Sequence, residues 1–241
     1  MNHKRYDILI IGAGAVGCAL AWQLSHFNVK VAVLEKNSDV AGETTGRNSA
    51  VVHAGFNNKP GSLMARFCVE GNKGFEKLCE ELHVPYKKTG KMVVALEESD
   101  VPAIERLLAQ GQANGCEGLE IIDPERIREL MPDACGYKAL WSPETAVTSP
   151  FLYCVALADN AAENGVEFLL DTGVTGIEKG SDGDGYVVST GTGDADGEVY
   201  YAKIIVNCAG LGAADVASMA GIDKYNVYPC RGQYYILDVD S

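Results

Sequence analysis

The sequence predicts an α/β fold that begins with a parallel β-sheet. Residues 7–11, "DILII", have the apolar character of a buried strand, residues 14–27 follow a helical pattern, and residues 29–36, "VKVAVLEK", form a second apolar run. Three glycines in the spacing G-x-G-x-x-G lie between the first strand and the helix, at Gly12, Gly14 and Gly17. Together these observations indicate a Rossmann-type βαβ unit at the N-terminus.

The composition is that of a globular, acidic chain. Of its 241 residues 47% are hydrophobic, which is enough to bury a sizeable core. The formal net charge of −13 argues against a nucleic-acid or anionic-membrane partner, because basic faces bind phosphate backbones. The net negative charge of the protein would repel an anionic substrate, so such a substrate would need a nearby Arg or Lys to bind it.

The eight cysteines predict free thiols and no metal site. They lie at positions 18, 68, 79, 116, 135, 154, 208 and 230, with no CxxC pair and no Cys/His spacing typical of zinc. The run "ILIIGAGAVGCALAW" is too short and too broken by glycine to span a membrane comfortably, and its glycines argue against a signal peptide. We expect a cytoplasmic protein without a transmembrane segment.

The rest of the chain alternates helices and short strands. Apolar spacing predicts helices over residues 60–82, 100–113, 124–131 and 150–164. The apolar face of the first of these helices contains Leu63, Phe67, Phe75, Leu78 and Leu82. Strands are expected around a glycine turn within 86–98, and at 138–141, 166–170 and 173–178. Residues 180–210 indicate two antiparallel strands with a turn at 194–197, and their spacing does not fit a calcium-binding EF-hand.

The glycine motif and Glu35 predict a dinucleotide site. The first glycine permits a tight turn, the second lets the backbone approach a pyrophosphate, and the third allows close helix–strand packing. The helix N-terminus attracts phosphate, and Glu35, 18 residues after Gly17, can accept hydrogen bonds from both ribose hydroxyls. The cofactor residues predicted here are Gly12, Ala13, Gly14, Ala15, Val16, Gly17, Glu35 and Lys36.

Residues 43–56, "ETTGRNSAVVHAGF", favour FAD over NAD. The glycine motif does not separate the two, but a polar loop directly after the Glu35 strand can lie along the pyrophosphate and reach a flavin ring. Alone, the stretch also fits a polar surface loop leading into a short buried strand. Its predicted cofactor contacts are Thr44, Thr45, Gly46, Arg47, Asn48, Ser49 and His53. A third element is the apolar strand 204–210, whose last residues, Cys208, Ala209 and Gly210, are small enough to sit against the dinucleotide.

The order of these motifs resembles the D-amino-acid-oxidase-like superfamily of FAD enzymes. The resemblance covers nearly the whole chain and is greatest to the glycerol-3-phosphate dehydrogenase and L-2-hydroxyglutarate oxidase branch. It is carried by "DILIIGAGAVG", "VLEK", "TTGRNSAVVHAGF", "KPGSLMARFCVEG", "GVEFLLDTGVTGIE", "IIVNCAG" and "PCRGQYYIL". It implies a discontinuous Rossmann-type FAD-binding domain over 1–84 and 146–221. Residues 85–145 and 222–241 would then form part of a mainly antiparallel α+β substrate domain.

The resemblance also implies roles for single residues. Gly12, Gly14, Gly17, Glu35, Thr45, Arg47, Asn48, Ser49, Val174 and Gly210 would contact FAD, Val174 through its backbone beside the adenine. His53 matches a position that faces the flavin and that carries a covalent link to it in some members. The chain departs from the pattern in length, because such enzymes usually continue well past 241 residues.

These features predict a flavin dehydrogenase or oxidase that takes a hydride from a small anionic 2-hydroxy substrate. The leading candidate substrate is glycerol 3-phosphate. His53 is the candidate base and Arg231 the candidate anchor for a carboxylate or phosphate. Alternatively, His53 is a core histidine and Arg231 a surface arginine. The rival functions are oxidation of L-2-hydroxyglutarate or of an amine, and a truncated cofactor-binding module that needs a partner chain. The electron acceptor stays open.

Overall fold

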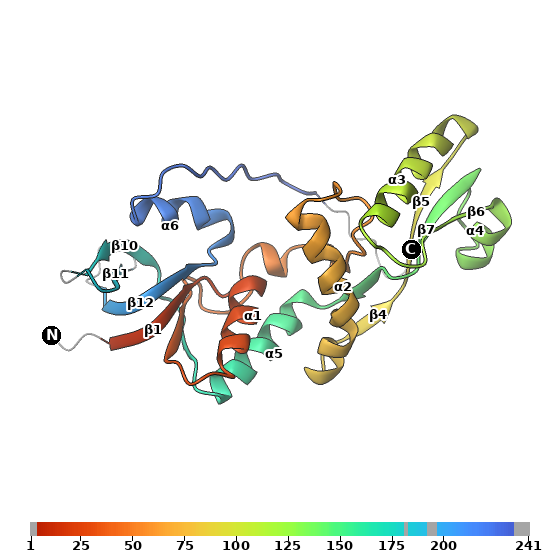
Figure 1. The fold of residues 1–241 in the computed structure, drawn as a ribbon. Helices are drawn as coiled ribbons and strands as arrows, with labels where there is room; N and C mark the ends of the chain where they lie inside the picture. The colour runs from red at the N-terminus through yellow and green to blue at the C-terminus, as the bar shows by residue number, and fades with distance from the viewer. Residues whose placement is uncertain (1–3, 181–182, 192–196, 234–241) are drawn as a thin grey trace. The chain divides into compact units, whose positions relative to one another are not determined.

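The computed structural model describes residues 4–180, 183–191 and 197–233 (Figure 1). Contacts divide the chain into two compact units, one made of Met1–Gly46 and Leu157–Ser241 and the other of Arg47–Ala156. The helix α5 (Pro150–Glu163) carries the chain from the second unit back into the first. No helix among the described residues is long and apolar enough to cross a bilayer.

The first unit is built on a six-stranded sheet in the order β10-β11-β12-β1-β2-β9. Four neighbouring strands, β12 to β9 in that order, run parallel, whereas β10, β11 and β12 pair antiparallel. The strands are β1 (Lys4–Ile11), β2 (Val31–Leu34), β9 (Glu167–Leu169), β10 (Val174–Lys179), β11 (Tyr186–Thr190) and β12 (Val199–Asn207). The predicted βαβ unit is confirmed, with α1 (Ala15–Leu24) between β1 and β2. Residues 194–196 of the predicted hairpin turn lie outside the described residues.

The core of this unit follows from the apolar runs in its strands. All four residues of β2 are buried, and Leu9 and Ile11 of β1 pack with Leu34 and with Val216 of α6 (Ala213–Met219). The carboxyl ends of three parallel strands are tied together by the backbone. The N–H of Gly12 donates to the carbonyl of Leu34, and that of Cys208 to the carbonyl of Ile11, both at 2.8 Å. The chain segments after β1, β2 and β12 are thus held side by side.

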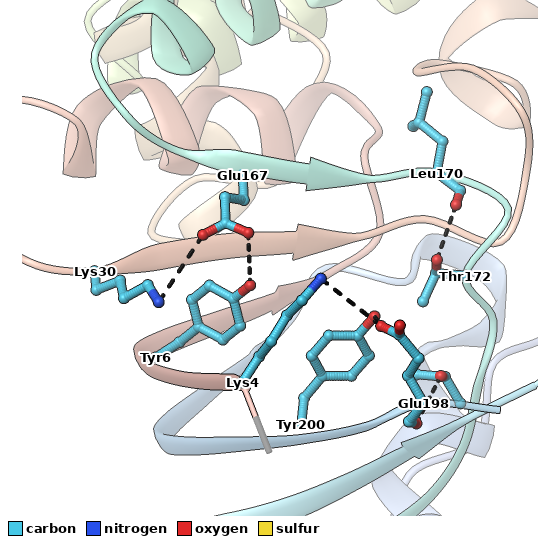
Figure 2. Close-up of polar contacts among 9 residues, drawn as sticks. Lys4, Tyr6, Lys30, Glu167, Leu170, Thr172, Glu198 and Tyr200 are labelled. Atoms are coloured by element: carbon cyan, nitrogen blue, oxygen red, sulfur yellow. Dashed lines mark hydrogen bonds and ion pairs between the residues drawn. The ribbon is translucent and has the colours of Figure 1, made fainter. Parts of the chain in front are cut away.

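Two tyrosine–glutamate pairs lie on the same sheet (Figure 2). The Tyr6 hydroxyl donates to the Glu167 carboxylate at 2.8 Å, and the Tyr200 hydroxyl donates to the Glu198 carboxylate. The two rings lie side by side, with centroids 6.4 Å apart. Burial and the adjacent carboxylates raise the pKa of both tyrosines, so both hydroxyls stay protonated. The Tyr6 pair links β1 to β9, across the intervening strand β2.

The second unit contains two antiparallel sheets of three strands each, in the orders β3-β8-β4 and β5-β7-β6. The strands are β3 (Val51–Val52), β4 (Tyr86–Lys88), β5 (Lys91–Ala95), β6 (Glu120–Ile122), β7 (Lys138–Ser142) and β8 (Ala146–Thr148). The helices are α2 (Leu63–Glu81), α3 (Val101–Ala113) and α4 (Pro124–Leu130). The predicted strands around a glycine turn are β4 and β5, but they belong to different sheets and do not form a hairpin.

Helix α2 forms as predicted, but it buries a different set of residues. Ala65, Val69 and Cys79 are buried, whereas Leu63 and Phe67 are more than half exposed. The helix lies close to Gly55, where an added Cβ would come within 2.9 Å of the Val69 side chain. Small side chains therefore suit this contact better than the large apolar ones that the periodicity selects.

Candidate cofactor site

A cavity of about 370 Å³ lies in the first unit, at the carboxyl ends of the parallel strands. It is lined by the glycine turn after β1, the start of α1 and the segments after β2 and β12. This is the edge at which open α/β sheets bind their ligands. Predicted cofactor residues that line it are Gly12, Gly14, Ala15, Val16, Glu35, Lys36, Thr44, Thr45, Val174, Cys208, Ala209 and Gly210.

Each glycine of the motif has a distinct steric setting. Gly12 has φ +102°, and an added Cβ there would lie 2.6 Å from the Cys208 carbonyl oxygen. A Cβ at Gly17 would lie 1.9 Å from the carbonyl oxygen of Gly12. At Gly14, by contrast, a Cβ would meet a single atom of the described residues within 4 Å, the Thr45 hydroxyl oxygen at 3.2 Å. The first and third glycines are therefore required by the fold, whereas the second keeps space open in the cavity.

The N-terminus of α1 faces the cavity with backbone donors. Its N-cap, Gly14, supplies no side-chain cap, and the N–H of Ala15 donates to the Thr45 hydroxyl at 3.1 Å. Val16, the next residue, lines the cavity and is 70% exposed. Backbone N–H groups at the start of a ten-residue helix, with the positive end of its dipole, are suited to an anionic group such as a pyrophosphate.

Glu35 is 8% exposed, and its carboxylate is held by three hydrogen bonds. One oxygen accepts from the N–H of Ala13 at 2.8 Å. The other accepts from the backbone and side-chain N–H groups of Asn37, at 2.9 and 2.7 Å. A carboxylate offers about four lone-pair directions, so room for a further donor remains. Glu35 therefore fixes the glycine turn and can still accept a ribose hydroxyl, although with less capacity than the sequence alone implies.

The charge of the cavity lining does not itself attract phosphate. Its cation, Lys36, is paired at 2.9 Å with Glu43, and Glu35 and Asp215 add further negative charge. An anion there depends on backbone dipoles. The residues fit the ADP part of a dinucleotide on two structural grounds, namely the donors of α1 and the space that Gly14 leaves open.

The sequence missed several residues of this cavity. Thr172 and Gly173 line it just before β10, and the N–H of Thr172 donates to the Glu35 carbonyl at 2.7 Å. Leu211 lines it from the turn before α6, and Asp215 and Met219 line it from α6 itself. The sequence signal that could have identified these residues is that they lie close in the chain to Val174 and Gly210, which were predicted to contact the cofactor. Cys208 is enclosed enough that burial raises the pKa of its thiol.

Four predicted residues belong to the second unit: Arg47, Asn48, Ser49 and His53. Asn48 shapes the local turn, because its side-chain oxygen accepts from the N–H of Ala50 at 2.8 Å. His53 follows β3 directly and its side chain is exposed. The surrounding protein partly desolvates the imidazole and Lys91 adds positive charge, and both effects lower the pKa of His53.

Arg231 lies in the first unit, in a stretch without helix or strand. Its side chain is exposed, and it is not among the described residues that line the cavity. The predicted role of Arg231 as a substrate anchor therefore stays a prediction.

Ala13 and Gly46 are two further predicted cofactor residues that do not line the cavity. The N–H of Ala13 donates to Glu35, and the carbonyl of Ala41 packs against Gly46.

Comparison with known proteins agrees with the geometry. A family model described as FAD dependent oxidoreductase (DAO) matches residues 7–241. The chain is 39% identical over 235 residues to a glycerol 3-phosphate dehydrogenase of Caloramator mitchellensis, covering 97% of this chain and 48% of the relative. It is 37% identical over 236 residues to a mitochondrial L-2-hydroxyglutarate dehydrogenase of Caenorhabditis elegans, covering 97% and 54%. The chain thus spans about half the length of these curated relatives.

A solved structure gives the same result for the fold. The L-alpha-glycerophosphate oxidase of Mycoplasma pneumoniae, with FAD bound, superposes with a TM-score of 0.82 at 30% identity. The match covers 90% of this chain and 57% of that one. FAD is the cofactor of the matched family, and the predicted α/β fold with additional antiparallel sheets is confirmed. The chain belongs to the DAO family of FAD-dependent oxidoreductases.

Proposed function

We propose that the protein containing this chain oxidises a small anionic 2-hydroxy substrate, with glycerol 3-phosphate as the first candidate. The observation that carries the proposal is the dinucleotide cavity, in a chain 39% identical to a glycerol 3-phosphate dehydrogenase. FAD supplies the acceptor for the hydride that leaves the carbinol carbon. The second candidate substrate is L-2-hydroxyglutarate, because a relative with that name is 37% identical over nearly the same length.

The cofactor residues of the first unit hold the ADP half of FAD. The N–H groups at the start of α1 bind the pyrophosphate, Glu35 accepts from the ribose, and Val174 lies beside the adenine. Thr45 already bonds to Ala15, which places its hydroxyl next to the phosphate position. We also propose the functional domains given above, FAD-binding over 1–84 and 146–221 and substrate-binding over 85–145 and 222–241.

His53 is the proposed base for the hydroxyl proton of the substrate. Its ordinary pKa of 6.5 is lowered by desolvation and by Lys91, so the imidazole is neutral at pH 7. A neutral imidazole can accept a proton at its free ring nitrogen. The substrate needs such a base beside its hydroxyl group, because the hydroxyl proton leaves when the carbinol carbon loses its hydride. Lowering the pKa favours that state, because a protonated His53 could not act as a base.

The test is anaerobic reduction of the bound flavin in the full-length protein. Glycerol 3-phosphate, L-2-hydroxyglutarate and an L-amino acid are added separately, and bleaching of the flavin absorbance is followed in a stopped-flow instrument. We expect the fastest bleaching with glycerol 3-phosphate. Faster bleaching with L-2-hydroxyglutarate would transfer the assignment to that substrate. A protein that retains flavin but is reduced by none of the three would contradict the proposed activity and favour a cofactor-binding module.

A further inference from the structure

The segment around His53 and the start of β5 are connected through a shared neighbour. In the sheet β3-β8-β4, Val52 pairs antiparallel with Ala146, so the next residues on the two strands are His53 and Thr145. The N–H of Gly90 donates to the carbonyl of that same Thr145 at 2.8 Å. Thr145 therefore lies next to the pair that precedes His53 and bonds to Gly90, the residue directly before Lys91. The segments that contain His53 and Lys91 thus approach each other at Thr145.

The position of Lys91 is set by its surroundings. Gly90 has φ +67°, and a Cβ there would lie 1.9 Å from the Trp141 ring, so the chain enters β5 in a defined path. The ammonium nitrogen of Lys91 lies 5.6 Å from the ring centroid of Phe56, which is 3% exposed. Phe56 is three residues after His53. The backbone just before Lys91 thus bonds to Thr145, near His53, and the ammonium group of Lys91 lies near Phe56, which follows His53 in the chain.

Lys91 is partly buried and has no carboxylate partner among the described residues, whereas Lys87, which also forms no ion pair with them, is exposed. Lys88 is paired with Glu76 and Glu144, and Lys73 with Glu117. Lys91 forms no ion pair with the residues that the structure describes. In a chain with a net charge of −13, a half-buried cation left without a carboxylate beside a neutral imidazole is suited to bind an added anion.

We propose that Lys91 binds the anionic group of the substrate, a phosphate or a carboxylate, next to His53. This inference rests on the proposed function, since it concerns the substrate of that reaction. Lys91 touches the substrate but takes no proton, so it sets specificity for anionic substrates. The same cation favours the unprotonated state of His53, which is the state that can accept the proton of the substrate.

The first experiment reads the imidazole directly in the full-length protein. With histidine labelled for NMR, the pKa of His53 is measured in the parent, in Lys91→Met and in Lys91→Arg, with and without inorganic phosphate or glutarate. Lys138→Met is the matched control, because Lys138 pairs with Ala95 at the opposite end of the β5–β7 ladder. We expect each anion to raise the His53 pKa in the parent, in Lys91→Arg and in Lys138→Met, but not in Lys91→Met.

A change of the His53 pKa in Lys91→Met equal to that in the control, or no change in the parent, would overturn the proposal.

The second experiment measures steady-state kinetics. Lys91→Met should raise KM for glycerol 3-phosphate about 10- to 100-fold, with a smaller change in kcat and no change in KM for neutral glycerol. If parent flavin is reduced by glycerol 3-phosphate but Lys91→Met leaves KM unchanged, only this inference fails. If anions bind at Lys91 but no 2-hydroxy acid or glycerol 3-phosphate reduces the flavin, the proposed function fails instead.

Discussion

The Glu35 carboxylate accepts a hydrogen bond of 2.8 Å from the backbone N–H of Ala13. This bond joins the end of β2 to the glycine turn after β1, two segments 22 residues apart in the chain. The carboxylate that is predicted to bind the ribose thus also fixes the turn that is predicted to receive the pyrophosphate. The two halves of the nucleotide site depend on one side chain.

Replacing Glu35 by Ala should therefore weaken cofactor binding in two ways. The ribose loses a charged acceptor, and the Ala13 N–H loses its partner. We expect a loss of about 1.5–3 kcal/mol for the charged hydrogen bond, which is about 10- to 100-fold in FAD affinity. Flavin retention after gel filtration and the melting temperature measure both effects. The control is Glu178→Ala, at an exposed position of β10, and equal flavin retention in Glu35→Ala would contradict the assigned role.

The second and third glycines of the motif should respond oppositely to alanine. Gly17→Ala places a Cβ 1.9 Å from the Gly12 carbonyl oxygen, so the helix must shift, at a cost of about 1–3 kcal/mol in stability. Among the described residues Gly14→Ala meets the Thr45 hydroxyl alone, at 3.2 Å, so a small shift of that side chain should let the protein fold, while FAD affinity falls at least about tenfold. Circular dichroism melts and flavin content separate the two. Full flavin occupancy in Gly14→Ala would show that the phosphate lies elsewhere.

The tyrosine pairs predict a loss of stability at alkaline pH. Burial and the carboxylates of Glu167 and Glu198 raise the pKa of Tyr6 and Tyr200 above the ordinary value of 10.0. Their contribution to stability is complete below pH 10 and decreases as the pH rises toward the folded-state pKa. Denaturant unfolding between pH 8 and 11 measures this. The double variant with Tyr6→Phe and Tyr200→Phe should lose less stability over that range, and an unchanged slope would contradict the prediction.

The pH dependence of catalysis should reflect the imidazole of His53. Because its pKa is lowered, the acid limb of the kcat/KM profile should lie below the ordinary histidine value of 6.5. His53→Gln should abolish that limb and reduce kcat about 100-fold or more while flavin content is retained. His83→Gln, at an exposed position just after α2, is the control. An acid limb that persists in His53→Gln would assign the base to another group.

The sequence by itself determined the elements whose signals are local. The βαβ unit follows from two apolar runs and a helical period. The steric need for glycine at Gly17 is contained in the G-x-G-x-x-G spacing, because the clashing atom is the carbonyl oxygen of Gly12 in the same turn, whereas at Gly12 the clash is with the distant Cys208. The five helices predicted from periodicity are present, within a few residues at each end. Among the α-helices of the described residues, α6, a short helix of seven residues, was not predicted.

Only the tertiary structure decided which distant residues meet. Periodicity could not place β4 and β5 in different sheets, because strand pairing depends on the partners β8 and β7 farther along the chain. It could not select Val69 over Phe67 as a buried residue, because close contact with Gly55 makes that choice. Thr172 and Asp215 line the same cavity as the glycine motif, and Lys91 lowers the pKa of His53, although these residues are far apart in sequence. Such contacts arise when the whole chain packs, and no short stretch encodes them alone.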